Sequence, residues 1–279
     1  GSTEWASGTH EELNEYLHTF NWEGSILLAH NTLFDGAILN WCFDVHPRIY
    51  TDTLCIARAL HGVEVGGSLH ALTQRYNLGE KGTEVLDAIG KRRADFNDLE
   101  LDRYGDYCVN DVELTYKLFN RMGKNFPKGE LRLIDCTLRM FIEPVVELDL
   151  GLLEHHLENT KQIKEDIIVS SGVTKKELMS NPKFAALLEA RGVIPPMKTS
   201  LTTGKQTYAF AKTDEQFKAL LDHADPYVQT LVTSRLGTKS TLEEARTERF
   251  IGIAKRGLMP VPIRYYAAHT GRWGGDDKI

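Results

Sequence analysis

The hydrophobic pattern of the first half alternates between short apolar runs and amphipathic segments. Residues 25–30 form a continuous apolar run, which is typical of a central strand buried on both faces, and residues 48–50 predict a second strand. Helical spacing follows each strand, over 33–42 and over 54–60, and residues 51–53 are a polar cap before the second helix. Alternating strands and helices predict an α/β sheet.

Further helices are marked by their start signals and spacing. Thr9 followed by Glu12 is a capping-box pattern, and it predicts a helix that extends to Phe20. Helical spacing recurs over 68–76 and, for much longer, over 98–122.

The pattern changes near residue 130, where we predict a domain boundary that separates residues 1–130 from 131–279. Beyond it, helices dominate and alternation stops. The predicted linker spans 123–129, helical patterns span 130–143, 152–170, 214–223 and 226–253, and extended segments span 195–204 and 263–268.

Composition places the chain among ordinary globular proteins. Hydrophobic residues make up 42% and charged residues 26% of the 279 positions. No stretch approaches the roughly 18 consecutive apolar residues of a membrane helix, so no membrane partner is predicted. The four cysteines form no Cys-x-x-Cys pair, which argues against a zinc knuckle and a disulfide framework. We therefore predict a reducing, cytoplasmic location.

Charge differs between the two halves. Residues 1–130 hold 12 basic and 20 acidic side chains, whereas residues 131–279 hold 21 and 19. Two interpretations of the basic stretch near the C-terminus stay open: a surface that follows DNA phosphates, or a solvated helix face balanced by Glu243, Glu244 and Glu248. The basic residues of this stretch are Lys239, Arg246, Arg249, Lys255, Arg256, Arg264 and Arg272.

The first candidate for chemistry follows the first predicted strand. There, Asn31 and Thr32 can cap the next helix, and Phe34 and Asp35 lie in its first turn. A carboxylate at a strand end is well placed to bind a divalent metal ion through oxygen. The alternative is that Asp35 only complements the helix dipole.

The second candidate lies inside the long helix predicted over 98–122. Tyr107 and Asp111 are four residues apart, so the phenol and the carboxylate share one face of the helix. Both can reach the same bound water or metal ion. The alternative is an ordinary half-buried tyrosine above a solvated aspartate.

Together, Asn-x-x-Phe-Asp after a strand and Tyr-x-x-x-Asp on a later helix resemble the second and third motifs of proofreading 3′→5′ exonucleases, which have an RNase H-like fold. The resemblance implies four carboxylates that bind two divalent metal ions, Mg²⁺ or Mn²⁺, and a tyrosine that orients the attacking water. Asp35 and Asp111 match two of these carboxylates, and Tyr107 matches the tyrosine. Asn31 and Phe34 match positions that contact the DNA end or shape its pocket.

The first motif of that family, Asp-x-Glu on the opening strand, is missing from residues 1–25. We therefore expect that this motif and the first strands of the sheet lie upstream of this segment, and that Gly1 and Ser2 are a cloning remnant. The metal pair is expected only where the first motif is present.

The second half resembles another part of the same enzymes. Three segments, 196–210, 234–241 and 265–275, resemble the stretch before the thumb tip, the thumb and the start of the palm in family A DNA polymerases, particularly the bacteriophage members. The resemblance implies that Arg272, in Thr-Gly-Arg, contacts the primer end in the minor groove. It also implies that Lys239 and Ser240 meet the DNA backbone.

Three functional hypotheses result. The favoured one is a segment of a phage-like family A DNA polymerase, with DNA synthesis and proofreading in the whole enzyme. Its partners are a single-stranded 3′ end and a primer–template duplex, and its location is the cytoplasm of a bacterial host if it is phage-encoded. The polymerase aspartates lie downstream in the family, so we expect no synthesis from this segment alone. The alternatives are a stand-alone RNase D-like exonuclease and a catalytically inactive DNA-binding module; the host and any processivity partner stay open.

Overall fold

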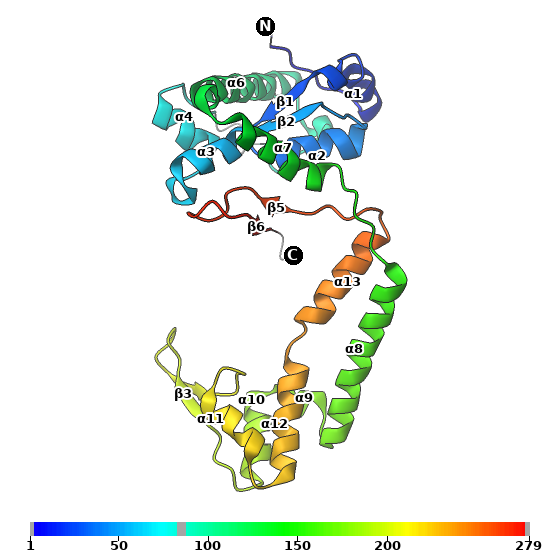
Figure 1. The fold of residues 1–279 in the computed structure, drawn as a ribbon, viewed down its shortest axis with the longest axis vertical. Helices are drawn as coiled ribbons and strands as arrows, with labels where there is room; N and C mark the ends of the chain where they lie inside the picture. The colour runs from blue at the N-terminus through cyan, green and yellow to red at the C-terminus, as the bar shows by residue number, and fades with distance from the viewer. Residues whose placement is uncertain (1–2, 83–87, 277–279) are drawn as a thin grey trace. The chain divides into compact units, whose positions relative to one another are not determined.

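The computed structural model describes residues 3–82 and 88–276, so Gly1 and Ser2, interpreted above as a cloning remnant, lie outside it. The chain divides into two compact units, Gly1–Val146 with Leu258–Ile279 and Glu147–Gly257 (Figure 1). Helix α7 (Lys128–Ile142) packs on the strands and helices of the first unit, which therefore continues past residue 130. The roles predicted for residues 1–130 and 131–279, as exonuclease domain and as thumb with the start of the palm, stay predictions.

The first unit is built around a pair of parallel strands. β1 (Ile26–Ala29) lies beside β2 (Ile49–Asp52), with Ile26 opposite Ile49 and Ala29 opposite Asp52. α6 packs on β1, and α7 packs on β2 and on α2 (Figure 1). Among the residues that the structure describes, the other helices of this unit are α1 (His10–Leu17), α2 (Thr32–Phe43), α3 (Thr53–His61), α4 (Leu69–Tyr76) and α6 (Asp98–Met122).

Several predicted helix starts are confirmed by their caps. Thr9 and Glu12 form the capping box of α1, with the Thr9 N–H donating to Glu12 at 2.7 Å. Asp52 caps α3, and Ser68 caps α4. The long helix begins and ends where its spacing predicts, and a second capping box stands at its start.

The prediction that residues 25–30 are buried on both faces is wrong for the described residues, and their place at the centre of a larger sheet stays a prediction. Within the described ranges β1 pairs only with β2, so one edge of β1 has no strand beside it. Ile26 is accordingly 54% exposed, and the other three residues of β1 are half-buried. A continuous apolar run shows that a segment is extended, but the number of its neighbours depends on the rest of the sheet.

The core of the first unit joins α3, α6 and α7 to β2. Ile56, Leu114, Leu118 and Ile134 are at most 1% exposed, and the ring of Tyr50 packs among them. Burying each aliphatic side chain contributes about 1.5–3 kcal/mol. These contacts fix α6 against β1, α3 and α4.

The second unit is mainly helical. α8 packs against α12 and α13, and Phe184, Phe210 and Phe217 lie at the centre of a separate core. Two short helices, α9 and α10, occur where no helix was predicted. The elements are α8 (Leu150–Ser171), α9 (Lys175–Met179), α10 (Asn181–Glu189), the hairpin β3 (Met197–Thr199) with β4 (Gln206–Tyr208), α11 (Glu215–Lys218), α12 (Pro226–Lys239) and α13 (Leu242–Ala254).

Three predicted spans in the later part of the chain need correction. The pattern over 226–253 is two helices, because Ser240 is extended (φ −87°, ψ 121°) and ends α12. The segment 123–129 is not a loose linker, since it holds a 3-10 turn (Gly123–Asn125) and the start of α7. The strand over 263–268 stops after β5 (Ile263–Arg264), because Tyr266 is left-handed at φ 53°.

β5 pairs antiparallel with β6 (Gly274–Gly275), and this ribbon belongs to the first unit. The indole N–H of Trp273 donates to the hydroxyl of Thr137 on α7 at 3.0 Å, and the Tyr265 hydroxyl donates to Glu130. These contacts fasten the C-terminal ribbon to α7. The remaining 3-10 turns are Trp22–Gly24, Val63–Val65, Arg93–Asp95 and Ala219–Asp222. Among the helices of the described ranges, none has the length and apolar character needed to cross a membrane.

Candidate functional site

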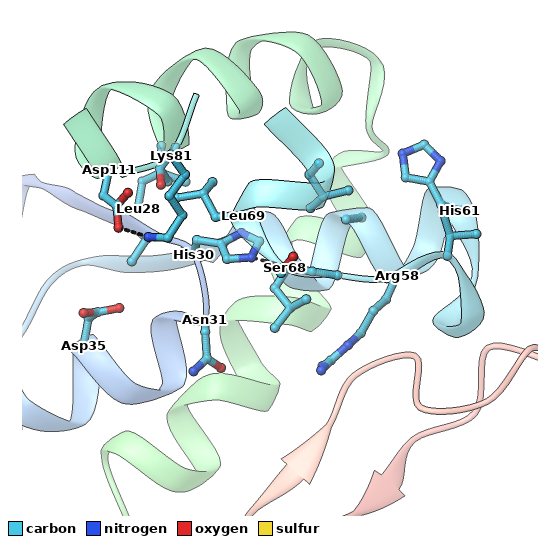
Figure 2. A pocket seen from close by; sticks show the side chains of 18 of the residues that line it. Leu28, His30, Asn31, Asp35, Arg58, His61, Ser68, Leu69, Lys81 and Asp111 are labelled. Carbon is cyan, nitrogen blue, oxygen red and sulfur yellow. Dashed lines mark hydrogen bonds and ion pairs between the residues drawn. The ribbon is translucent and has the colours of Figure 1, made fainter. Parts of the chain in front are cut away.

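A cleft of about 760 Å³ opens at the carboxyl ends of β1 and β2. Parallel strands present these ends at one edge, which is where ligands bind in α/β sheets. The walls come from the end of β1, the start of α2, α3, the start of α4 and the middle of α6 (Figure 2). Its polar and charged lining residues are His30, Asn31, Asp35, Arg58, His61, Ser68, Lys81, Asp111 and Thr115.

The turn from β1 into α2 sets the position of Asn31 and Asp35. Asn31 occupies the N-cap position, as predicted, but in a left-handed conformation (φ 75°, ψ 50°) and without capping through its side chain. Asparagine tolerates this region better than most residues. The hydroxyl of Thr32 instead holds the turn, because it donates to the carbonyl of Thr51 at 2.7 Å and accepts from the Ala29 N–H.

Asp35 lies one turn into α2 and lines the cleft (Figure 2). The pKa of its carboxyl is raised, mainly because the cleft walls partly bury it. A hydrogen bond from the backbone N–H of Asp35 lowers this pKa, whereas the nearby Asp52 carboxylate raises it further. A positive charge beside Asp35 would favour its charged form and oppose these effects. Phe34, its neighbour, is 66% exposed and is not part of the cleft lining.

Asp111 projects from α6 into the same cleft, one turn after Tyr107. The structure thus brings Asp35 and Asp111 to one cavity, as the sequence predicts. Asp111 Oδ1 is buried and has no hydrogen-bond partner among the described residues. Burial raises the pKa of Tyr107, so its phenol stays protonated at neutral pH. Tyr107 itself does not line the cleft, and it reaches the site through a third residue.

That third residue is Lys81, which the sequence analysis did not single out. Its ammonium donates to Tyr107 Oη at 2.6 Å. The same ammonium pairs with Asp111 Oδ2, as Figure 2 shows. Burial alone would lower the pKa of Lys81, but the hydrogen bonds to Asp111 and Tyr107 outweigh it and the pKa is raised. Lys81 is therefore a cation at neutral pH. Its loop carries no local motif that could have identified it.

His30 ties the end of β1 to the loop before α4. Its Nδ1 lies 2.8 Å from the Thr53 hydroxyl and its Nε2 lies 2.8 Å from the carbonyl oxygen of Gly67. Since a carbonyl only accepts, Nε2 carries the proton. Burial lowers the pKa of His30 against the opposing effect of Asp52, so the ring is neutral at neutral pH. This histidine shapes the cleft wall.

The described residues do not by themselves fit a pair of divalent ions. Across 3–82 and 88–276, no group of three or more His, Cys, Asp or Glu side chains is placed to hold a metal ion. The unpartnered oxygen of Asp111 is the feature that points to an additional ligand. Two carboxylates, one of them paired with a lysine, supply too few anionic oxygens for two hard cations.

The residues predicted to bind DNA in the second half fall in different compact units. Lys239 ends α12 and Ser240 follows it, whereas Arg272 lies in the connection between β5 and β6. Arg272 is exposed, and its Nε donates to the Thr270 hydroxyl at 3.0 Å. The glutamates of α13 point to α8: Glu243 pairs with His156 at 3.1 Å, Glu244 with Lys164 at 2.6 Å and Glu248 with Lys161 at 2.9 Å.

Comparison with known proteins identifies a matching family and a similar structure. Residues 9–127 match a family model described as 3'-5' exonuclease, of the DNA polymerase A type. No curated protein matches the sequence. Among solved structures, the POL domain of Pol1 from M. smegmatis, in complex with DNA primer-template and dNTP, is similar, with a TM-score of 0.54 and 17% identity. The match covers 96% of this chain and 45% of that chain.

At this identity the structural likeness concerns the fold alone, and this chain spans less than half the length of the mycobacterial chain. The predicted fold class, an α/β domain of the RNase H-like exonuclease type followed by a mainly helical part, is confirmed. The family match over residues 9–127 supports the resemblance to family A DNA polymerases, and the bacteriophage type stays a prediction.

Proposed function

We propose that this chain is part of a family A DNA polymerase of bacteriophage type, and that the cleft at the ends of β1 and β2 receives the 3′ end of a DNA strand for proofreading. One observation carries this proposal. Asp35 and Asp111, which come from distant parts of the sequence, line the same cleft, and one oxygen of Asp111 is buried without a partner. The match of residues 9–127 to a 3'-5' exonuclease family supports it.

Each side chain has a proposed task. The Asn31 side chain, at the cleft, and the exposed ring of Phe34, one turn away, contact the terminal nucleotide. The phenol of Tyr107, protonated at neutral pH, orients the attacking water by hydrogen bonding. Hydrolysis itself needs further acidic ligands, because Asp35 and Asp111 supply half of the carboxylates that the family resemblance implies. We propose that an Asp-x-Glu strand completes the site, with two divalent ions as cofactors.

The second half is proposed to hold duplex DNA as the thumb and the beginning of the palm. The pairing of Glu243, Glu244 and Glu248 with α8 supports this proposal, because those carboxylates are directed to another helix. Lys239 and Arg246 are exposed, and no salt bridge to either is seen among the described residues. A phosphate backbone is a suitable partner for such side chains.

A second candidate function is a DNA-binding module without hydrolysis. The ion pair between Lys81 and Asp111 favours it for the chain as it stands, because one of the two candidate ligand carboxylates is already neutralised. The stand-alone RNase D-like alternative requires metal-dependent activity from these 279 residues alone. Activity with added metal therefore separates these alternatives.

The test uses the 279-residue chain and a single-stranded DNA labelled at its 5′ end. Fluorescence anisotropy measures the affinity, and a denaturing gel follows degradation with Mg²⁺ or Mn²⁺. We expect weak binding and slow or absent degradation. Phe34→Ala should weaken binding several-fold, since base–aromatic stacking contributes about 1–3 kcal/mol.

The matched control is Phe20→Ala, another exposed phenylalanine of the first unit, which should leave the affinity unchanged. Equal effects of the two substitutions, or no binding at all, would contradict the proposed cleft. Brisk 3′→5′ degradation would show that other residues of this chain complete the site.

A further inference from the structure

Lys81 occupies an unusual position for a lysine. Its side chain is 22% exposed, its ammonium lies 4.7 Å from the centre of the Tyr107 ring, and the same ammonium contacts both the phenol oxygen and the Asp111 carboxylate. Lys81 lies in the loop after α4, and Figure 2 shows it reaching Asp111 on α6. One cation therefore holds both functional side chains that α6 presents.

The contact between Lys81 and Asp111 neutralises a carboxylate of the cleft. Asp35 and Asp111 are the carboxylates of the lining, and Asp111 is only 24% exposed. A half-buried carboxylate is stable when a positive charge lies close to it. In the present arrangement Lys81 is that charge. It engages Oδ2 and leaves Oδ1 without a partner.

An ammonium and a divalent ion cannot both occupy the space in front of one carboxylate. Like charges at contact distance repel, and the repulsion is strong where solvent is partly excluded. Binding of a divalent ion to Asp111 thus requires that Lys81 move away or that the ion accept a poorer position at Oδ1.

We propose that Lys81 is a built-in cation that competes with a divalent ion for Asp111. The inference deepens the proposed function and rests on it in one respect, namely that Asp111 is a ligand of the exonuclease site. Lys81 is a positioning residue, since it acts through Asp111 and Tyr107. Its removal should free both oxygens of Asp111 and strengthen metal binding, whereas loss of a merely structural contact would weaken it or leave it unchanged.

A suitable control lysine lies in the same unit. Lys91 also forms an ion pair, with Glu100 at 3.5 Å, and also lies over an aromatic ring, that of Phe96 at 5.1 Å. It is not part of the cleft lining. Substituting Lys91 removes the same kinds of contact without changing the charge beside Asp111.

The experiment measures the affinity of the 279-residue chain for Mn²⁺ alone by electron paramagnetic resonance. Lys81→Met keeps the aliphatic stem over the Tyr107 ring and removes the charge. We expect it to bind Mn²⁺ at least about tenfold more tightly than the unchanged chain, which corresponds to about 1.4 kcal/mol. Lys81→Arg, which keeps the charge, and Lys91→Met should stay within about twofold of the unchanged chain.

Adding Asp111→Asn to Lys81→Met should abolish the gain. Circular dichroism checks that each variant is folded, and Lys81→Gln replaces Lys81→Met if the latter unfolds. Unchanged or weaker Mn²⁺ binding after loss of the Lys81 charge overturns the proposal, as does absence of Mn²⁺ binding in every variant. Because no DNA is present, such a failure does not bear on the binding of single-stranded DNA or on the effect of Phe34→Ala. The two proposals can therefore fail separately.

Discussion

The backbone N–H of Asn31 donates a 3.0 Å hydrogen bond to Oδ1 of Asp52, and this contact joins the ends of the two parallel strands. The same oxygen accepts from the Leu54 N–H at 2.8 Å, while the other oxygen faces the thiol of Cys55 at 3.4 Å. Asp52 is 2% exposed. One buried carboxylate therefore fixes the start of α3 and the turn that places Asp35 in the cleft.

We expect Asp52→Ala to lower the free energy of unfolding by about 2–4 kcal/mol, because two backbone N–H groups near the strand ends lose their acceptor. Urea denaturation measures this change. Asp106→Ala, on the exposed face of α6, should change it by less than about 0.5 kcal/mol. A loss at Asp52 no larger than the loss at Asp106 would show that the turn is held by Thr32 alone.

The catalytic assignment predicts an order of effects in a longer form of the protein that includes an Asp-x-Glu strand. Asp35→Ala and Asp111→Ala should each reduce 3′→5′ degradation by at least about 10³-fold and leave DNA synthesis nearly unchanged. Tyr107→Phe should cost about ten- to a hundredfold, since it removes one hydroxyl and no carboxylate. A primer-degradation assay measures all three rates; equal losses would mean that Tyr107 does more than orient water.

The affinity of the second half for duplex DNA should depend on salt. If Lys239 meets a phosphate, a log–log plot of affinity against salt should have a slope of about −0.9 per contact, and Lys239→Ala should reduce that slope by about one unit. Lys218→Ala is the control, because Lys218 is exposed and pairs with the exposed Glu215 at 2.8 Å. If Lys239→Ala leaves the slope unchanged, the basic stretch is a solvated surface that does not contact DNA phosphates.

Arg272 is expected to act differently from Lys239. A contact in the minor groove tests base-pair geometry, so Arg272→Ala should chiefly reduce binding of a primer–template with a paired 3′ end and spare one with a mismatched end. Competition between the two duplexes for the 279-residue chain measures the ratio. The same loss for both would indicate a backbone contact only.

The core of the second unit contains a charge whose loss should be costly. Arg235 is 1% exposed, lies between Phe184 and Phe210, and donates to the Leu178 carbonyl and to the Asn181 side chain. Burial lowers its pKa to about 10, so it stays protonated at neutral pH.

Arg235→Ala should therefore destabilise the chain by about 3–5 kcal/mol, because it leaves a cavity and two acceptors without donors. Arg235→Met, which refills the space between the rings, should cost less. Arg191→Ala removes a similar contact with Tyr227 from an exposed position and should cost at most about 1 kcal/mol. Thermal unfolding ranks the three; equal costs for Met and Ala at position 235 would mean that the ring contacts contribute little.

Local signals account for what the sequence could predict. The start of α1 is correct because Thr9 and Glu12 satisfy each other within one turn, and α6 is correct because its apolar spacing lasts for 25 residues. Asp35 and Asp111 could be assigned to one site only because their two motifs together resemble those of proofreading exonucleases.

What the sequence could not predict depends on contacts between distant segments. Lys81 meets Asp111 only because the loop after α4 folds against α6, and no local sequence pattern in either segment predicts that packing. The burial of β1 was overestimated for the same reason, since its neighbours are not encoded in its own four residues. The break at Ser240 likewise interrupts a segment whose residues on both sides favour helix.

The unpaired edge of β1 also bears on whether the chain self-associates at high concentration. Within the described residues no strand pairs along that edge, Ile26–Ala29 contains no charged residue or proline to repel another strand, and Ile26 is exposed. Such an edge is a template on which a second molecule can add its own strand. Concentrating the 279-residue chain should therefore favour self-association along this edge.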